Sequence, residues 1–194
     1  MRRLADPHVG HPLGCPLACI VLTILIAATP ACKRKKSEAP GQPVAQAAES
    51  AQGAALSSMV HVADPRAALQ LTRGFHQVEH DSWRWTEGSF AATLGAPPGS
   101  SQQGALLVLR FSIPDVVIQT LKTIRLSASV NGLALPPQEY SKPGQYTYAR
   151  DIPPSALAAQ AVSVEFTLDK FLPPSASDER ALGVIVSAIG FEAK

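Results

Sequence analysis

The sequence predicts an all-β fold: a single antiparallel β-sandwich over residues 73–194. Two observations support this prediction. Apolar and polar residues alternate with a period of two in several short segments after Gly74, the pattern of strands with one buried face. Turn-forming residues, including four Pro-Pro pairs, separate these segments. The chain shows neither a βαβ rhythm nor an internal repeat, so a parallel α/β fold is not expected.

The N-terminal segment has the composition of a signal or anchor. Arg2 and Arg3 precede residues 7–32, which contain no Lys, Arg, Asp or Glu. The apolar centre of this segment, residues 17–28, has the length of a secretory hydrophobic region and is short for a membrane-spanning helix. Residues 1–31 are therefore expected to form a signal peptide or a membrane anchor helix.

Cys32 follows the small residues Thr29 and Ala31, and this stretch resembles the lipobox of bacterial lipoproteins. In that family the cysteine is diacylated and becomes the new N-terminus; Leu is usual where this chain has Thr29. The resemblance implies an exported protein of the cell membrane or outer membrane, anchored by lipid at Cys32. The alternative is a single-pass membrane protein whose uncleaved anchor leaves the basic residues 33–36 on the cytoplasmic side.

Residues 32–72 are expected to be a flexible linker. Residues 33–58 are rich in Ala, Gln, Ser, Pro and Gly and contain no aromatic residue, a composition that buries too little apolar surface to fold. Further on, Asp64 and Pro65 form the start signal of a short helix, with Gly74 as its stop signal.

Charge and cysteine usage exclude several classes of function. The net charge is +2, and residues 33–36 supply much of it in one cluster. From Arg73 onward, cations and carboxylates nearly balance, which argues against a nucleic-acid partner because such a partner needs a basic face. All three cysteines lie within the first 32 residues, so neither a disulfide framework nor a thiolate metal site is expected in the sandwich.

Residues 122–130 are the clearest predicted strand. Their apolar and polar side chains alternate, and Asn131-Gly132 follows, the strongest two-residue hairpin signal. A two-residue turn pairs Val130 with Leu133 and keeps the apolar face continuous across the hairpin. This hairpin is the local basis for an antiparallel arrangement.

Four further segments complete the predicted sheets. Residues 89–94 and 162–169 alternate in the same way. Residues 104–113 and 182–191 are apolar on both faces for part of their length, which is typical of central strands. Several short strands with turns between them indicate a β-sandwich of the jelly-roll or galactose-binding-like kind.

The aromatic residues are the candidate ligand contacts. Trp83 and Trp85 share one face of a predicted strand, and Arg84 points to the other. Tyr146 and Tyr148 also share a face. Flat aromatic rings cover the apolar faces of sugars, so Trp83, Arg84, Tyr146 and Tyr148 are the candidate binding residues. Trp85 is expected in the core because a sandwich commonly packs a tryptophan there, whereas Trp83 is open to either position.

No catalytic constellation is evident. His76, Glu79 and His80 spell H-x-x-E-H, but that zinc chemistry requires a helix, and the surrounding residues favour a strand. The chain contains no G-x-S-x-G motif, P-loop or dinucleotide glycine pattern. Neighbouring carboxylates such as Glu79 and Asp81 are expected at the surface. The sequence therefore predicts a protein that is not an enzyme, with no cofactor and no metal.

Asp178 and Arg180 precede the predicted strand that starts at Leu182. Their spacing is compatible with a buried ion pair that clamps the loop or with a solvated turn. The segments "GFHQVE", "WRWTEGSFAATL" and "LPPSASDERALGVIVSAIGFE" together resemble an accessory β-sandwich domain of bacterial cell-envelope proteins, also appended to some polysaccharide glycosyltransferases. The resemblance covers residues 73–192. It implies a non-catalytic sandwich in a glycan-related setting and assigns no catalytic residue.

The sequence thus predicts an exported, membrane-tethered, non-catalytic β-sandwich that binds carbohydrate or cell-envelope glycan. The alternative is a structural or protein-interaction lipoprotein without a small-ligand site. The expected partners are membrane lipid, through Cys32 or the apolar N-terminal segment, and a glycan or an envelope protein, but no nucleic acid.

Overall fold

The computed structural model describes residues 55–194. The expected signal or anchor of residues 1–31, the lipidation candidate Cys32 and most of the expected linker lie outside the described residues. Within the described part, no helix is both long enough and apolar enough to span a bilayer.

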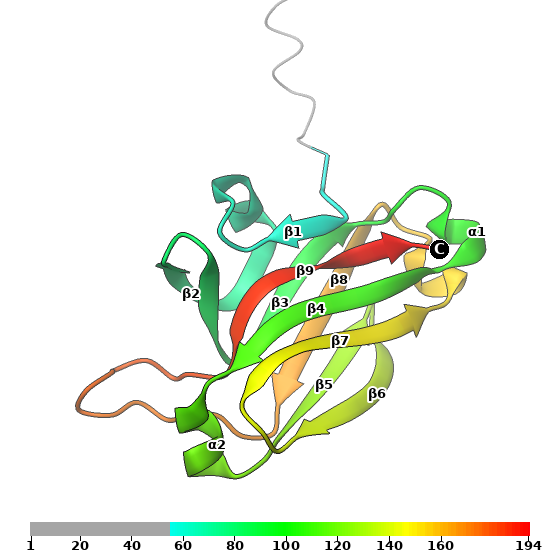
Figure 1. Ribbon diagram of the computed structural model, residues 1–194. Coiled ribbons are helices and arrows are strands. Elements are labelled where there is room, and N and C mark those ends of the chain that lie inside the picture. The colour runs from blue at the N-terminus through cyan, green and yellow to red at the C-terminus, as the bar shows by residue number, and fades with distance from the viewer. Residues whose placement is uncertain (1–54) are drawn as a thin grey trace, which may run out of the picture. The chain divides into compact units, whose positions relative to one another are not determined.

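The described residues form one antiparallel nine-stranded sheet that folds over on itself, which confirms the all-β prediction (Figure 1). The strands are β1 Met59–His61, β2 Leu71–Glu79, β3 Trp83–Gly95, β4 Ala105–Ile113, β5 Ile124–Val130, β6 Leu133–Tyr140, β7 Gly144–Ile152, β8 Ala161–Leu168 and β9 Ile185–Ala193. Two short helices and two 3-10 turns connect them: α1 Ser100–Gln103, α2 Asp115–Leu121, η2 Pro65–Leu69 and η3 Pro154–Leu157.

Strand β3 belongs to both layers of the sandwich. Residues 89–95 of β3 pair with β8, whereas Arg84 and Trp85 pair with β9. The strand order β6-β5-β8-β3-β9-β4-β7 therefore bends at β3, and β9, β4 and β7 lie in front of β8, β5 and β6 in Figure 1. Strand β1 adds to β9, and β2 adds to β3.

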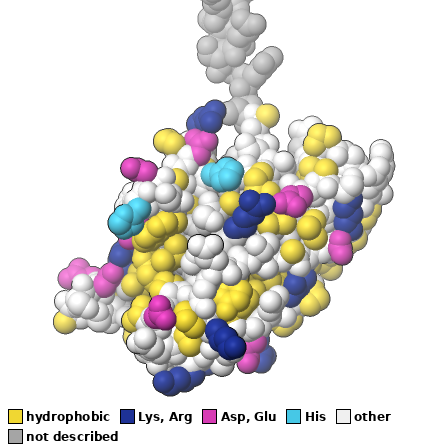
Figure 2. Space-filling model, in the orientation of Figure 1, with side chains coloured by type: hydrophobic (Ala, Val, Ile, Leu, Met, Phe, Trp, Pro, Cys, Tyr) yellow, Lys and Arg dark blue, Asp and Glu magenta, His cyan; other side chains and the backbone are white. Residues whose placement is uncertain are grey.

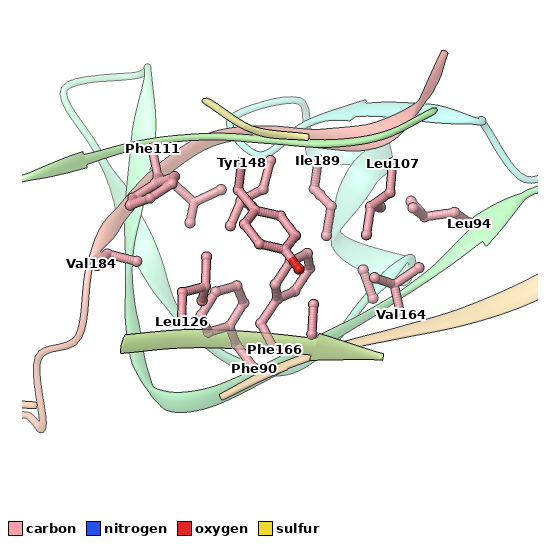
Figure 3. Close-up of a cluster of buried hydrophobic side chains, with 14 of the residues drawn as sticks. Phe90, Leu94, Leu107, Phe111, Leu126, Tyr148, Val164, Phe166, Val184 and Ile189 are labelled. Carbon is pink, nitrogen blue, oxygen red and sulfur yellow. The ribbon is translucent and has the colours of Figure 1, made fainter. Parts of the chain in front are cut away.

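The core lies between these layers. Figure 3 shows Tyr148, Leu107 and Ile189 pointing from one layer toward Phe90 and Phe166 of the other. The Phe90 and Phe166 rings stack with centroids 5.1 Å apart. The alternation predicted for β8 is confirmed, since every second side chain along that strand is buried. Each large apolar side chain buried in this way contributes about 1.5–3 kcal/mol to stability.

Side chains of β7 close the seam between the two outer strands β6 and β7. The Tyr148 hydroxyl donates to the Pro136 carbonyl oxygen at 2.9 Å, and Arg150 Nε donates to the same oxygen at 3.0 Å. Arg150 also donates to Gln138 Oε1 at 3.1 Å, and its guanidinium lies 4.2 Å from the centre of the Tyr148 ring. Pro136 and Pro137 have no N–H, so side chains join this edge where a backbone ladder would be incomplete.

The predicted hairpin is confirmed. Asn131 and Gly132 have φ values of 47° and 82°, as a type I′ turn requires, and Val130 pairs with Leu133. The predicted helix start is also confirmed: the Asp64 side chain accepts the Arg66 N–H at 2.9 Å. The 3-10 turn ends well before Gly74, the expected stop signal, because Gly74 lies within β2.

The sheet begins nearer to the N-terminus than the expected boundary at residue 73. Strand β1 pairs with the central strand β9. The buried Gln70 side chain donates to the Ser57 and Thr93 carbonyl oxygens and accepts the Ser57 N–H, at 2.9–3.0 Å. Residues 57–72 are therefore part of the folded sandwich. Strand β1 has only three residues, too few to show an alternation of apolar and polar side chains in the sequence.

Candidate ligand-binding groove

An open groove of about 370 Å³ lies beside the start of β3, on the solvent-facing side of β9, β4 and β7. Its polar lining residues are Arg110, Ser112, Gln145, Thr147 and Ser187, and its apolar borders include Trp83, Ile185 and Tyr146. Figure 2 shows this layer in front, covered mostly by apolar and uncharged polar side chains with scattered charges.

Strand register places the polar lining residues. Ser112 of β4 lies opposite Ile185 of β9 on one side and Gln145 of β7 on the other. Arg110, two residues earlier on the same face, lies opposite Thr147. Their neighbours on β4 point inward, because side chains alternate along a strand. The apolar face holds the layers together while the polar face lines the groove.

A β-bulge shapes the groove next to Trp83. Arg110 pairs with Ala188 and Phe111 pairs with Val186, so Ser187 is the extra residue of β9. The β3 register, in which Arg84 pairs with Val186, would place Trp83 opposite this unpaired serine. A bulge interrupts a ladder and redirects side chains, and bulges are common beside functional sites.

Trp83 and Trp85 have different environments. Trp85 is 9% exposed and belongs to the core, as predicted. Trp83 packs against the core but remains half-buried at the groove, and the His80 ring lies beside the indole with centroids 5.4 Å apart. Trp83 is the first residue of β3 and lies opposite Glu79 of β2.

Tyr146 borders the groove from β7. Its hydroxyl donates to the Lys142 carbonyl oxygen at 2.9 Å, and its ring lies 4.7 Å from the ring of Tyr140. The Tyr140 hydroxyl is buried without a hydrogen-bond partner among the described residues, and burial raises the pKa of Tyr140 to about 12. The Tyr146 ring is thus held in place by the fold, packed against Phe111 and Tyr140 on the inner side of β7.

Arg84 and Tyr148 do not line the groove. Arg84 donates to the Val62 and His76 carbonyl oxygens at 2.7 and 2.9 Å, and burial lowers the pKa of its guanidinium. Tyr148 is fully buried in the core. Of the four candidate binding residues, the structure brings Trp83 and Tyr146 to one groove and gives Arg84 and Tyr148 internal contacts.

The polar lining residues were not among the sequence candidates. A signal was present in "LRFSI", where Arg110 and Ser112 alternate with Phe111 and Ile113. The apolar residues before Arg110 masked this alternation and indicated a strand buried on both faces. Ser187 carries no sequence signal, because a bulge depends on the pairing of two distant strands.

The H-x-x-E-H residues lie on β2 and the turn that follows it, not on a helix. His76 Nε2 lies 2.7 Å from the Ala181 carbonyl oxygen and therefore donates to it, and Glu79 Oε1 accepts from Arg180 at 2.7 Å. No cluster of three potential metal-ligating side chains occurs among residues 55–194. The two side chains connect β2 to the loop that precedes β9.

An ion cluster fixes that loop. Arg180 donates through Nε and Nη2 to the two carboxylate oxygens of Asp178 at 3.0 and 2.9 Å, and through Nη1 to Glu79 of β2. All three side chains are about one-third exposed, so the clamp is neither fully buried nor a plain solvated turn. This ion cluster joins two of the three segments quoted in the sequence analysis, residues 74–79 and 172–192, and its role is structural.

The ion pair between Asp178 and Arg180 is expected to make stability depend on pH in the acid range. Hydrogen bonds from Arg180 hold the pKa of Asp178 at about 2, below its usual 3.8. A carboxyl group whose pKa is lower in the folded state stabilises the fold at pH values above its pKa in the unfolded chain. That contribution is lost as the pH falls toward about 2. The difference in melting temperature between the wild type and Asp178→Asn should therefore narrow below about pH 4. Melting curves recorded from about pH 6 to 2 test this, and parallel profiles would contradict it.

No protein-family model matches the chain, and no curated protein matches it. An acetyl xylan esterase of the rumen bacterium Butyrivibrio proteoclasticus aligns with a TM-score of 0.42 and 7% identity, over 72% of this chain and 33% of that chain. This chain thus spans about a third of the esterase's length.

Two smaller solved structures also align. The CBM36-1 domain of a multidomain xylanase from the hindgut metagenome of Trinervitermes trinervoides has a TM-score of 0.37 and 10% identity, covering 70% of this chain and 96% of that one. A family 35 carbohydrate binding module from an environmental isolate has a TM-score of 0.33 and 12% identity, covering 72% and 88%. Because all three TM-scores are below 0.5, what this chain binds has to be inferred from the groove itself.

Proposed function

We propose that this protein is a non-catalytic β-sandwich that binds a glycan in the groove beside Trp83. The supporting observation is the composition of the groove: one half-buried indole stands next to hydroxyl and amide side chains. An aromatic face packs on the C–H face of a sugar ring, while hydroxyl and amide groups exchange hydrogen bonds with the sugar hydroxyls.

The open shape of the groove fits a binding role. Its five polar lining residues are two serines, a threonine, a glutamine and one arginine, so within residues 55–194 no carboxylate or histidine lines it. Glycoside hydrolysis commonly requires a pair of carboxylates that flank the bond. The groove therefore offers hydrogen-bonding and stacking contacts, but lacks the acid and base of such an enzyme.

The protein is further proposed to be exported and held at a membrane through Cys32. The support is the apolar segment 17–28, the small residues before Cys32 and the basic cluster 33–36. Basic residues beside a lipid anchor add about 1 kcal/mol each on an anionic membrane surface. Palmitate labelling in cells should be lost in Cys32→Ala, and a retained label would contradict acylation at that residue.

Trp83→Ala should weaken glycan binding by about tenfold to a hundredfold, since stacking of a ring on an aromatic side chain contributes about 1–3 kcal/mol by alanine substitution. Isothermal titration with cell-envelope oligosaccharides measures this effect on the full chain in detergent. Phe171→Ala is the matched control, because Phe171 is 42% exposed and lies outside the groove. The proposal fails if folded wild-type protein gives no heat with any oligosaccharide, or if both variants lose the same affinity.

A structural or protein-interaction lipoprotein is the second candidate, favoured by one exposed apolar site. Leu69, at the end of η2, is 87% exposed. It borders a groove of about 570 Å³ together with Leu56, Met59 and Ala67. Under this candidate, cross-linking in membranes recovers an envelope protein and Trp83→Ala has no effect on that partner.

A further inference from the structure

We propose that the glycan bound beside Trp83 carries a carboxylate and that Arg110 binds this group. The inference rests on the proposed function and specifies its ligand class as an acidic sugar. Arg110 is the only charged side chain among the described residues that line the groove. A neutral glycan needs no such group, because the serine, threonine and glutamine side chains already supply donors and acceptors.

The position of Arg110 suits this role. It stands on the solvent-facing side of β4, and its side chain is 54% exposed. Its backbone is fixed in two ladders, opposite Thr147 of β7 and Ala188 of β9. The Ser187 hydroxyl of the bulge also donates to the Arg110 carbonyl oxygen at 3.3 Å. The base of the side chain is thus held at the groove, while its guanidinium extends along β4 toward Glu192, which lies opposite Leu106.

The Arg110 guanidinium has N–H groups that are not engaged within residues 55–194. Nη2 donates to Glu192 Oε1 at 3.1 Å. Within residues 55–194, Nε and Nη1 of Arg110 make no hydrogen bond, in contrast to Arg150 and Arg180, whose three nitrogens all have acceptors. A planar guanidinium with free N–H groups binds a carboxylate through two parallel hydrogen bonds.

Glu192 can be displaced by such a ligand. Its side chain is 44% exposed, and ion pairs between exposed side chains are weak and exchange readily with solvent. A carboxylate on a sugar held against Trp83 competes at a high local concentration, since the ring is already bound. Glu192 then keeps Arg110 paired in the empty groove and gives way when an acidic sugar enters.

Paired oligosaccharides test the ligand class. The probes are a panel of uronic-acid oligosaccharides and the same molecules with their carboxyl groups reduced to alcohols, titrated into the full chain in detergent. The wild type should bind each acidic form at least about tenfold more tightly than its reduced form, as expected for a charge-assisted pair of hydrogen bonds. Arg110→Met, which keeps an apolar stem, should remove this preference.

Two further variants separate the site from general charge effects. Arg125→Met removes a cation of similar exposure that is also paired with a glutamate, but on β5 and outside the groove, so the preference should persist. Glu192→Gln frees Arg110 and should tighten binding of the acidic forms by about two- to fivefold while leaving the reduced forms unchanged.

The outcomes distinguish the two proposals. Equal binding of acidic and reduced forms, with Trp83-dependent affinity for both, overturns the role of Arg110 and leaves glycan binding intact. Loss of preference in Arg125→Met as well as Arg110→Met also overturns it, because net charge would then explain the effect. Absence of binding to every member of the panel counts against both proposals.

Discussion

Replacing Tyr148 by alanine is expected to lower the free energy of unfolding by about 3–5 kcal/mol, the usual cost of deleting a buried aromatic ring. Tyr148 is fully buried between the layers, and its ring makes an edge-to-face contact with the Phe166 ring, with centroids 6.2 Å apart. The Arg150 guanidinium lies on the ring and would lose that contact. The variant would open a cavity in the core and weaken the seam between β6 and β7 in one step.

Denaturant unfolding followed by circular dichroism measures this change. Tyr148→Phe is the control that keeps the ring and removes the hydroxyl, and it should cost only about 1 kcal/mol. The Pro136 carbonyl oxygen would still accept from Arg150 Nε, so it would not be left unpaired. Equal losses in the two variants would show that the hydroxyl, and not the ring, supplies the stability.

Gly74→Ala is expected to lower the free energy of unfolding by about 2–5 kcal/mol, from two sources of strain. Gly74 has a φ of 72°, a left-handed conformation that residues with a Cβ adopt at a cost. A Cβ at this position would also overlap the Ser89 carbonyl oxygen and lie 2.9 Å from Phe90 Cα. These are backbone atoms of β3, so β2 would have to move away from its partner.

The variant Gly132→Ala separates the two sources of strain, the left-handed backbone conformation and the close approach of a neighbouring strand. Gly132 has a φ of 82°, but a Cβ there would have no heavy atom within 4 Å. This variant should therefore lose only the conformational part, about 1–2 kcal/mol. Thermal and denaturant unfolding of both variants provide the comparison. A Gly74→Ala protein no less stable than Gly132→Ala would mean that the close approach of β2 and β3 is easily relieved.

Local pattern was enough to predict most of the strands. Alternation predicted the inward faces of β5 and β8, and Asn131-Gly132 predicted a turn with its register. These features depend on residues close together in the chain, where backbone geometry decides the outcome. The helix α2 was missed because its seven residues make only about two turns, too few for a clear helical period.

The candidate site was less predictable, because periodicity shows which side chains share a face but not which face is buried. Tyr146 and Tyr148 do share a face, yet it is the inner face of β7. The Tyr148 ring lies in the core, and the Tyr146 ring packs against Phe111 and Tyr140, although Tyr146 lines the groove between its outward-facing neighbours on β7. Arg84 was expected on the side away from the tryptophans and lies there, but backbone carbonyl groups of distant segments engage it. Arg110, Ser112 and Gln145 become neighbours only through the pairing of β4 with β7 and β9.

Because β3 runs through both layers, the domain is expected to unfold cooperatively. A single continuous strand supplies backbone hydrogen bonds to β8 at one end and to β9 at the other. Neither half of the sandwich can melt without withdrawing a segment that the other half needs, so partially open species are energetically penalised. The domain should accordingly behave as one all-or-none folding unit, and a proteolytic nick in β3 would dismantle the whole domain.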